Sequence, residues 1–317
     1  MKRKVCILFF LAVLSVGSCV LIHYQNKASG KKEGEQLRIA AIMMDPEMIF
    51  WEDVWDGTRM AAEENDIALS EYPYAQYDEN VASPIEMALL ADVDGILLRS
   101  QDTPAEELYQ ALDYARKTGK IIVTLDVDAG KNYRDAFVSI DNKAAAEALA
   151  EKAAEFLPEG KTAVIIKVAD KYMPKTAVTR VNAFRERFEM LRPKALLQIL
   201  ELPVDDGLRL GALVSYLQEE TEVGLLVGYA PKVTELAMSA VIKLKIEGQV
   251  QIVGFSESEN ALDAVEKGII QCLATQDPYQ MGKAGVEELL RLCVDKEEER
   301  KEQINIPFHL VSSDGAK

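Results

Sequence analysis

The chain has 317 residues, 49% of them hydrophobic, and this length exceeds what one ordinary core needs, so it predicts two lobes. A formal net charge of −16 argues against nucleic acid or an anionic membrane surface as a partner of the folded part. Only two histidines occur, which leaves little for a histidine-based metal site or a Ser-His-Asp relay.

The N-terminus reads as an export segment. The basic start "MKRK" precedes an apolar run, Val5–Ile22, of about 18 residues, close to the shortest length that spans a bilayer. Two interpretations remain open: an uncleaved anchor helix, or a lipoprotein signal in which Cys19 of "VGSC" carries the lipid. Both predict an extracytoplasmic protein tethered to the cytoplasmic membrane, with a signal or anchor segment at 1–22 and a polar linker at 23–36.

From Leu37 onward, short apolar runs alternate with amphipathic stretches, as in Trp51–Met60 and the alanine-rich Ala144–Leu157. Such runs suit strands buried on both faces of a parallel sheet. The alternation predicts an α/β fold, and strands in this number, about ten, fill two lobes better than one open sheet. The expected strands are Arg38–Met44, Ile67–Tyr72, Gly95–Ser100, Lys120–Asp126, Phe137–Asp141, Thr162–Val168, Leu196–Leu202, Val223–Tyr229, Val250–Phe255, Ile269–Thr275 and Ile304–Val311.

Two further cysteines lie in the folded part, Cys272 in a strand-like run and Cys293 on a helix-like face. No CxxC motif accompanies them, so a zinc or redox motif is not expected. The pattern favours two separate buried thiols and leaves a Cys272–Cys293 disulfide as the alternative.

The residues that follow the strands are the candidates for function, because ligands of parallel α/β sheets bind beyond the carboxyl ends of the strands. Carboxylates, amides, hydroxyls, one arginine and several aromatics stand there, a set that suits a polyhydroxylated ligand. Some have a structural alternative: Ser256 and Asp205 equally suit helix caps, and Trp51, for which a ligand role is favoured, also suits core packing. The candidate ligand-binding residues are Phe50, Trp51, Ser100, Asp126, Arg180, Tyr229, Ser256 and Gln276.

Catalytic signatures are missing from the sequence. It contains no GxSxG, GxxxxGK[ST] or GxGxxG motif and no metal-spaced cluster. We therefore expect a binding protein without enzymatic activity, cofactor or metal.

Several stretches carry a family resemblance in order along the chain: "IFWEDVWDGTRMAAEEN", "DVDGILLRS", "GKIIVTLDVDA", "TAVTRVNAFRERF" and "VQIVGFSESENALDAVEKGII". Together they resemble the type I periplasmic sugar-binding proteins, the ribose- and galactose-binding group, and the effector domain of lactose-repressor-type regulators. The resemblance implies two Rossmann-like lobes joined by a three-strand hinge. The N-terminal lobe would comprise 37–140 plus 277–302, and the C-terminal lobe 141–276 plus 303–317.

The resemblance also implies roles for individual residues. Phe50 and Trp51 would stack on a sugar ring, Asp126 would accept hydrogen bonds from its hydroxyls, and Arg180 would donate to them. Gln276 would reach the ligand from the hinge, with Ser100 at another ligand-facing strand end.

The chain departs from the family pattern at several pocket positions. Met48 and Ile49 stand where an asparagine is usual, Val127 where an arginine follows the pocket aspartate, and Ser256 where an aspartate follows "VGF". Tyr229 and Ala230 replace an Asn-Asp pair. Beside an ordinary sugar, these departures leave open a less polar or aromatic-bearing ligand and a pocket that has lost its sugar.

The implied function is an extracytoplasmic solute-binding protein that binds a small sugar-like ligand between its lobes and delivers it to an ABC transporter. The alternative is a membrane-anchored sensor that presents the bound ligand to a histidine kinase or a chemoreceptor.

Overall fold

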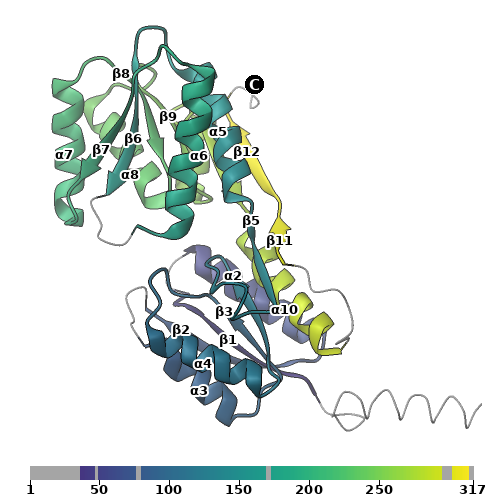
Figure 1. Cartoon of the computed structure of the whole chain (residues 1–317). Coiled ribbons are helices and arrows are strands. Elements are labelled where there is room, and N and C mark those ends of the chain that lie inside the picture. The colour runs from purple at the N-terminus through teal and green to yellow at the C-terminus, as the bar shows by residue number, and fades with distance from the viewer. Residues whose placement is uncertain (1–35, 47–48, 76–79, 169–172, 295–301, 314–317) are drawn as a thin grey trace, which may run out of the picture.

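The structure is a computed structural model that describes residues 36–46, 49–75, 80–168, 173–294 and 302–313 (Figure 1). Two α/β lobes are built around two sheets of six strands each, as the alternation of strands and helices predicts. In spatial order the first sheet contains β11 (Ile304–Ile306), β5 (Ala136–Ile140), β4 (Ile121–Leu125), β3 (Gly95–Leu98), β1 (Arg38–Met44) and β2 (Ala68–Tyr74), all parallel.

Among the described residues, four helices complete the first lobe. The helices are α2 (Ile49–Glu64), α3 (Ala82–Leu90), α4 (Glu106–Lys117) and α10 (Pro278–Val294), and α2 packs on α10 while α3 packs beside α4. Contact between α2 and α10 is close because two glycines face it. A Cβ added at Gly57 would clash with the carbonyl group of Tyr279, and one at Gly282 with the carbonyl oxygen of Val54.

In spatial order the second sheet contains β12 (Phe308–Ser312), β10 (Cys272–Gln276), β9 (Gln251–Phe255), β8 (Val223–Gly228), β6 (Thr162–Val168) and β7 (Leu197–Leu202). Only β12 runs antiparallel, against β10. The helices of this lobe are α5 (Asn142–Phe156), α6 (Lys175–Leu191), α7 (Asp206–Glu219), α8 (Pro231–Leu244) and α9 (Glu259–Glu266). Helix α5 packs on α6 and α7 on α8, so helices cover the buried strands of the sheet.

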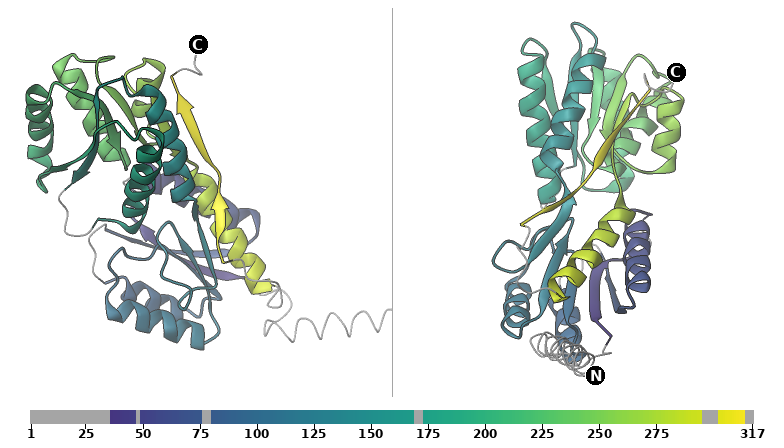
Figure 2. Two further views of the ribbon diagram at one scale, coloured as in Figure 1. Left: turned by 45° about the horizontal axis from the view of Figure 1, so that its top comes forward. Right: turned by 90° about the vertical axis from the view of Figure 1, so that its right-hand side faces the viewer.

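Within the described residues the chain passes between the lobes three times, between β5 and α5, between β10 and α10, and between β11 and β12 (Figures 1 and 2). The third passage differs from expectation. One strand was expected over Ile304–Val311, with 303–317 in the second lobe, but Ile304–Ile306 pairs with β5 of the first sheet. Pro307 separates it from β12, because proline lacks the N–H group that a continuing ladder needs.

The run Ile269–Thr275 also differs from expectation, because its first residues form a turn instead of a strand. Gly268 has a φ of +71°, and the backbone nitrogen of Ile269 donates to the carbonyl oxygen of Ala264 at 2.8 Å. Burial of Ile270 therefore reflects packing of the turn. Cys272 and Cys293 are not joined in a disulfide, as the sequence favoured.

No helix in the described part of the chain is long and apolar enough to cross a membrane. The expected signal or anchor segment, 1–22, with Cys19, lies outside the described residues, as does nearly all of the linker at 23–36.

Candidate functional site

The two lobes meet through residues that follow the carboxyl ends of their strands. Asp102, beyond β3, accepts a hydrogen bond through Oδ1 from the backbone nitrogen of Lys175, the first residue of α6, at 3.3 Å. Charges interact across the same junction, since Arg180 of the second lobe acts on Asp126 of the first. We call Asp53, Arg99, Asp126, Arg180 and Glu257 the interlobe charge cluster.

Arg99 anchors the first-lobe side of this cluster. Its side chain is buried, with Nη2 donating to Oδ2 of Asp102 at 2.9 Å and Nε lying 3.5 Å from Oδ2 of Asp126. Burial acts to lower the pKa of Arg99, but the interactions with Tyr74, Asp126 and Asp102 outweigh it and raise that pKa. Arg99 is therefore a buried cation that fixes two carboxylates at the junction.

Asp126 holds an unusual backbone conformation directly after β4. Its φ is +56°, in the left-handed region that few residues other than glycine adopt, although aspartate tolerates it. Its backbone nitrogen donates to the carbonyl oxygen of Val138 at 3.0 Å, which holds this turn in place. Burial raises the pKa of Asp126, whereas Arg99 and Arg180 act to lower it. Strained, charged residues of this kind cluster at ligand sites.

Arg180 is the corresponding group of the second lobe. Its Nε donates to Oδ1 of Asn142 at 2.7 Å, Nη1 donates to the backbone oxygen of Tyr229 at 3.2 Å, and its guanidinium carbon lies 4.1 Å from the ring centroid of Phe255. Burial lowers the pKa of Arg180, opposed by Asp126 and Glu257. Contacts from three elements thus fix the position of this guanidinium group. Tyr229 takes part through its backbone oxygen.

Among the aromatic residues at the start of α2, one lies in the core and the others lie near the junction of the lobes. Trp55 is fully buried and donates from Nε1 to the backbone oxygen of Met44 at 2.8 Å, so it belongs to the core. Trp51 is 3% exposed and meets the half-buried Phe50 edge to face, with ring centroids 5.2 Å apart. The guanidinium carbon of Arg99 lies 5.9 Å from the ring centroid of Trp51. Trp51 therefore serves the core while bordering the charge cluster.

The remaining candidate residues have mostly internal surroundings. Ser100 and Ser256 are fully buried, and Oγ of Ser256 lies 3.2 Å from Oγ of Ser258, the residue that caps α9. Asp205 caps α7 by accepting from the backbone nitrogen of Gly207 at 2.9 Å. Gln276 is half-buried at the end of β10, paired with Phe308 at the passage to α10.

Glu257 belongs to the site although it was not among the candidates. It directly follows Ser256 beyond β9, so its position alone points to the ligand side. Burial raises the pKa of Glu257 to about 7; Arg180 opposes this effect, and Asp126, Asp53 and Glu235 add to it. Arg99 and Asp102 follow β3 in the same way and were likewise left out.

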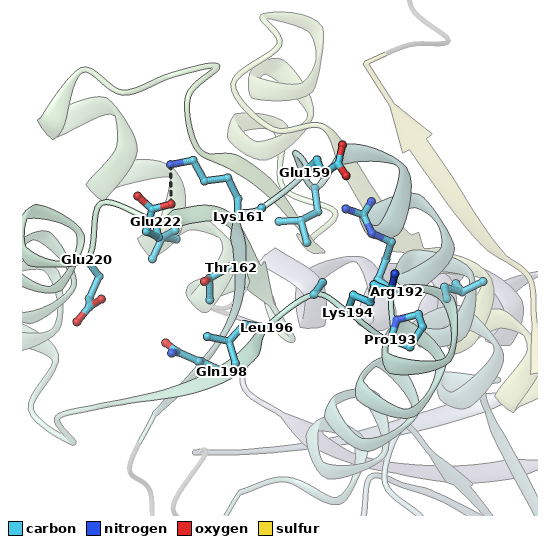
Figure 3. A pocket seen from close by; sticks show the side chains of 15 residues that line it. Glu159, Lys161, Thr162, Arg192, Pro193, Lys194, Leu196, Gln198, Glu220 and Glu222 are labelled. Carbon is cyan, nitrogen blue, oxygen red and sulfur yellow. Dashed lines mark hydrogen bonds and ion pairs between the residues drawn. The ribbon is translucent and has the colours of Figure 1, made fainter.

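A cavity of about 870 Å³ lies elsewhere, in the second lobe (Figure 3). Thr162 and Val223, which begin β6 and β8, line it together with Leu157 and Arg192 after α5 and α6. This is the amino-terminal edge of the sheet, opposite to where α/β sheets bind ligands. No residue of the interlobe charge cluster lines it. Among the described residues no group of His, Cys, Asp or Glu is arranged to hold a metal ion.

Comparison with solved structures places the fold. A glucose-galactose binding protein from Geobacillus stearothermophilus is 20% identical, with a TM-score of 0.75, and covers 88% of this chain and 98% of its own. A periplasmic ribose ABC transporter protein from Conexibacter woesei is 16% identical, with a TM-score of 0.78, covering 90% and 94%. A solute binding protein from Burkholderia graminis, in complex with D-arabinose, is 18% identical, with a TM-score of 0.78, covering 90% and 98%.

No curated protein sequence matches the chain. The model of the periplasmic binding protein domain, however, matches residues 39–297, which is most of the chain and both lobes. The chain belongs to the periplasmic binding protein domain family.

Proposed function

We propose that this chain is an extracytoplasmic solute-binding protein that takes a small sugar-like ligand between its two lobes and delivers it to an ABC transporter. It binds and presents the ligand without chemical conversion, as its family consists of binding proteins. Similar folds in proteins described as sugar-binding support the ligand class. Tethering by the N-terminal segment is part of the proposal and rests on the export pattern of that segment.

The observation that carries the proposal is the placement of Asp126, directly after β4 of the first lobe, and the buried Arg180, in α6 of the second lobe, with their charges acting on each other across the junction. A carboxylate accepts and a guanidinium donates, so the two groups suit neighbouring hydroxyls of one ligand. Because they belong to different lobes, a ligand that contacts both favours the closed arrangement by its differential affinity.

The half-buried Phe50 supplies an aromatic surface beside these polar groups. We propose Phe50 as the residue that covers the apolar face of the ligand ring, with Trp51 supporting it from the core. Gln276 would contact the ligand from the passage to α10. Ser100, Tyr229 and Ser256 would shape the surrounding backbone, since two are fully buried and the third holds Arg180 through its backbone oxygen.

A thermal unfolding screen tests the function. The full chain in mild detergent is heated with monosaccharides, disaccharides, polyols and nucleosides, and a ligand raises the unfolding temperature because it binds the folded state. Arg180→Ala should remove the shift, whereas Arg185→Ala, on the exposed side of the same helix, should keep it. The absence of a shift with every sugar would refute the sugar-binding proposal.

An uptake assay tests the partner. Cells that lack the gene should lose uptake of the ligand found by the screen if the partner is an ABC permease. Normal uptake together with a lost transcriptional response would replace the permease with a membrane sensor kinase or chemoreceptor.

A further inference from the structure

Building on the proposed function, we propose that Glu257 makes this site selective for sugars that carry a protonated amino group over their neutral parents. Glu257 lies where ligands of α/β sheets bind, directly beyond β9. The proposal has three supports: the Glu257 carboxylate lacks a hydrogen-bond partner among the described residues, negative charge is in excess around it, and a protonated amine would supply both a donor and a positive charge.

The Glu257 carboxylate has no hydrogen bond or ion pair with another described residue, although Arg180, Asp126 and Asp53 act on it electrostatically. Its neighbours differ in this respect. Asp102 and Asp126 share Arg99, and Arg180 is bonded to Asn142 and Tyr229. Among the described residues this half-buried carboxylate is thus the acceptor that a ligand donor would complete.

The charges at the junction do not balance. Among the described residues, Arg99 and Arg180 are the cations, whereas the carboxylates are Asp53, Asp102, Asp126 and Glu257. Glu235 of α8 adds another negative charge near Glu257, although Oε1 of Glu235 accepts from Ser258 at 2.7 Å. The segments that follow β1, β2 and β6 outside the described residues carry four carboxylates, Glu47, Asp78, Glu79 and Asp170, and one cation, Lys171, so their sequence adds no net positive charge.

A second observation shows that the cluster is incomplete without a ligand. Nε of Arg99 is buried and makes no hydrogen bond, although it forms a long ion pair with Oδ2 of Asp126 at 3.5 Å. Buried donors are nearly always satisfied in folded proteins, so the arginine side of the site lacks an acceptor just as Glu257 lacks a donor. A ligand must therefore bring oxygen acceptors together with a positive donor.

An amino sugar combines these groups. Its ammonium group donates up to three hydrogen bonds and carries the charge that the carboxylates lack, while its hydroxyls accept from the arginines. A neutral sugar can donate a hydroxyl to Glu257 but leaves the excess negative charge in place. A simple polyamine would neutralise the charge but would leave the arginines without acceptors.

Calorimetric titration of the full chain in mild detergent at pH 7 tests the inference. Two matched sets serve as probes: glucose, glucosamine and N-acetylglucosamine, and galactose, galactosamine and N-acetylgalactosamine. Acetylation keeps the nitrogen and removes its charge. In at least one set the amine should bind about tenfold or more tightly than both relatives, the usual effect of a charge-assisted hydrogen bond.

Glu257→Gln keeps the shape of the side chain and removes its charge, so it should reduce the preference to less than about threefold while the neutral parent still binds. Glu259→Gln, two residues further on an exposed position, should keep the preference. The wild type supplies a readout that needs no variant. Affinity for the amine should fall about tenfold per unit below pH 7, because protons then compete for Glu257, while affinity for the neutral parent stays level.

The outcomes separate the two claims. Neutral sugars that bind as tightly as the amines in both sets would overturn the selectivity and leave the sugar-binding function intact. An amine preference that survives Glu257→Gln would overturn the role of Glu257. Absence of binding by every member of both sets would overturn the inference, whereas the sugar-binding function itself stands or falls with the wider thermal unfolding screen.

Discussion

Asp102 of the first lobe accepts a hydrogen bond from the backbone nitrogen of Lys175, the first residue of α6 in the second lobe, at 3.3 Å. The same carboxylate accepts from Arg99 at 2.9 Å. A negative charge at the start of a helix is favourable, because the first N–H groups are unpaired and the helix dipole is positive there. This contact therefore favours the arrangement of the lobes seen here without requiring a ligand.

Replacing Asp102 with alanine should shift the lobes toward separation. Loss of the contact removes about 0.5–1.5 kcal/mol from the stability of the lobe arrangement seen here, a several-fold change in its population. Small-angle X-ray scattering should report a larger radius of gyration for Asp102→Ala in the ligand-free protein. Asp205→Ala is the control, because Asp205 caps α7 inside the second lobe. Equal radii for the wild type and Asp102→Ala would contradict the role of this contact.

The fluorescence of the two tryptophans can be separated by single substitutions, because the chain contains no others. Trp51 borders the charge cluster, whereas Trp55 is bonded to Met44 inside the core. Ligand should change the fluorescence of the wild type and of Trp55→Phe, but not of Trp51→Phe. Trp55→Phe should lose stability through its hydrogen bond, by about 0.5–1.5 kcal/mol, measured by urea unfolding. A persisting fluorescence change in Trp51→Phe would place the ligand elsewhere.

Stability should depend on pH through Glu257. Its pKa is raised from 4.5 to about 7, chiefly by burial, so between these values the folded state binds more protons than the unfolded state. The free energy of unfolding therefore falls as the pH rises through this window. Urea unfolding at several pH values should show a flatter profile for Glu257→Gln, which becomes the relatively more stable protein at high pH. Glu259→Gln should follow the wild type; a Glu257→Gln profile parallel to the wild type would exclude this effect.

The close contact of α2 and α10 predicts opposite effects for two glycines. Gly282→Ala should lower the free energy of unfolding by about 1–3 kcal/mol, because the new methyl group would meet the carbonyl oxygen of Val54. Gly211→Ala, in α7, meets nothing within 4 Å and should raise stability by about 0.5–1 kcal/mol through helix propensity. Thermal unfolding of both variants checks the signs, and a neutral Gly282→Ala would show that the helices are further apart.

Much of the fold could be predicted from the sequence, because buried parallel strands are continuous apolar runs. β1 and β6 have the expected bounds, Arg38–Met44 and Thr162–Val168. The errors arise where apolar residues are buried without forming a strand, as at Ile270, and where one apolar run serves two sheets, as on either side of Pro307. A local sequence pattern does not predict which sheet a strand joins.

The site was less predictable because its pairings depend on distant contacts. The position rule finds Asp126, and applied to every residue after a strand it also finds Arg99 and Glu257. Arg180 lies within α6, and the family resemblance indicated its role. Arg99 lies next to Asp126 because β3 pairs with β4 in the sheet. A local sequence pattern does not predict this pairing. Burial likewise separates Ser256 from Glu257, although the two are adjacent in the chain.

The central claim is that a sugar-like ligand binds between the lobes through Asp126 and Arg180, and an equilibrium titration followed by tryptophan fluorescence tests it most directly. The wild type and Arg185→Ala should show saturable binding of at least one sugar, and Asp126→Ala and Arg180→Ala should each lose it while remaining folded by circular dichroism. Undiminished affinity in both the Asp126 and Arg180 variants would contradict the account.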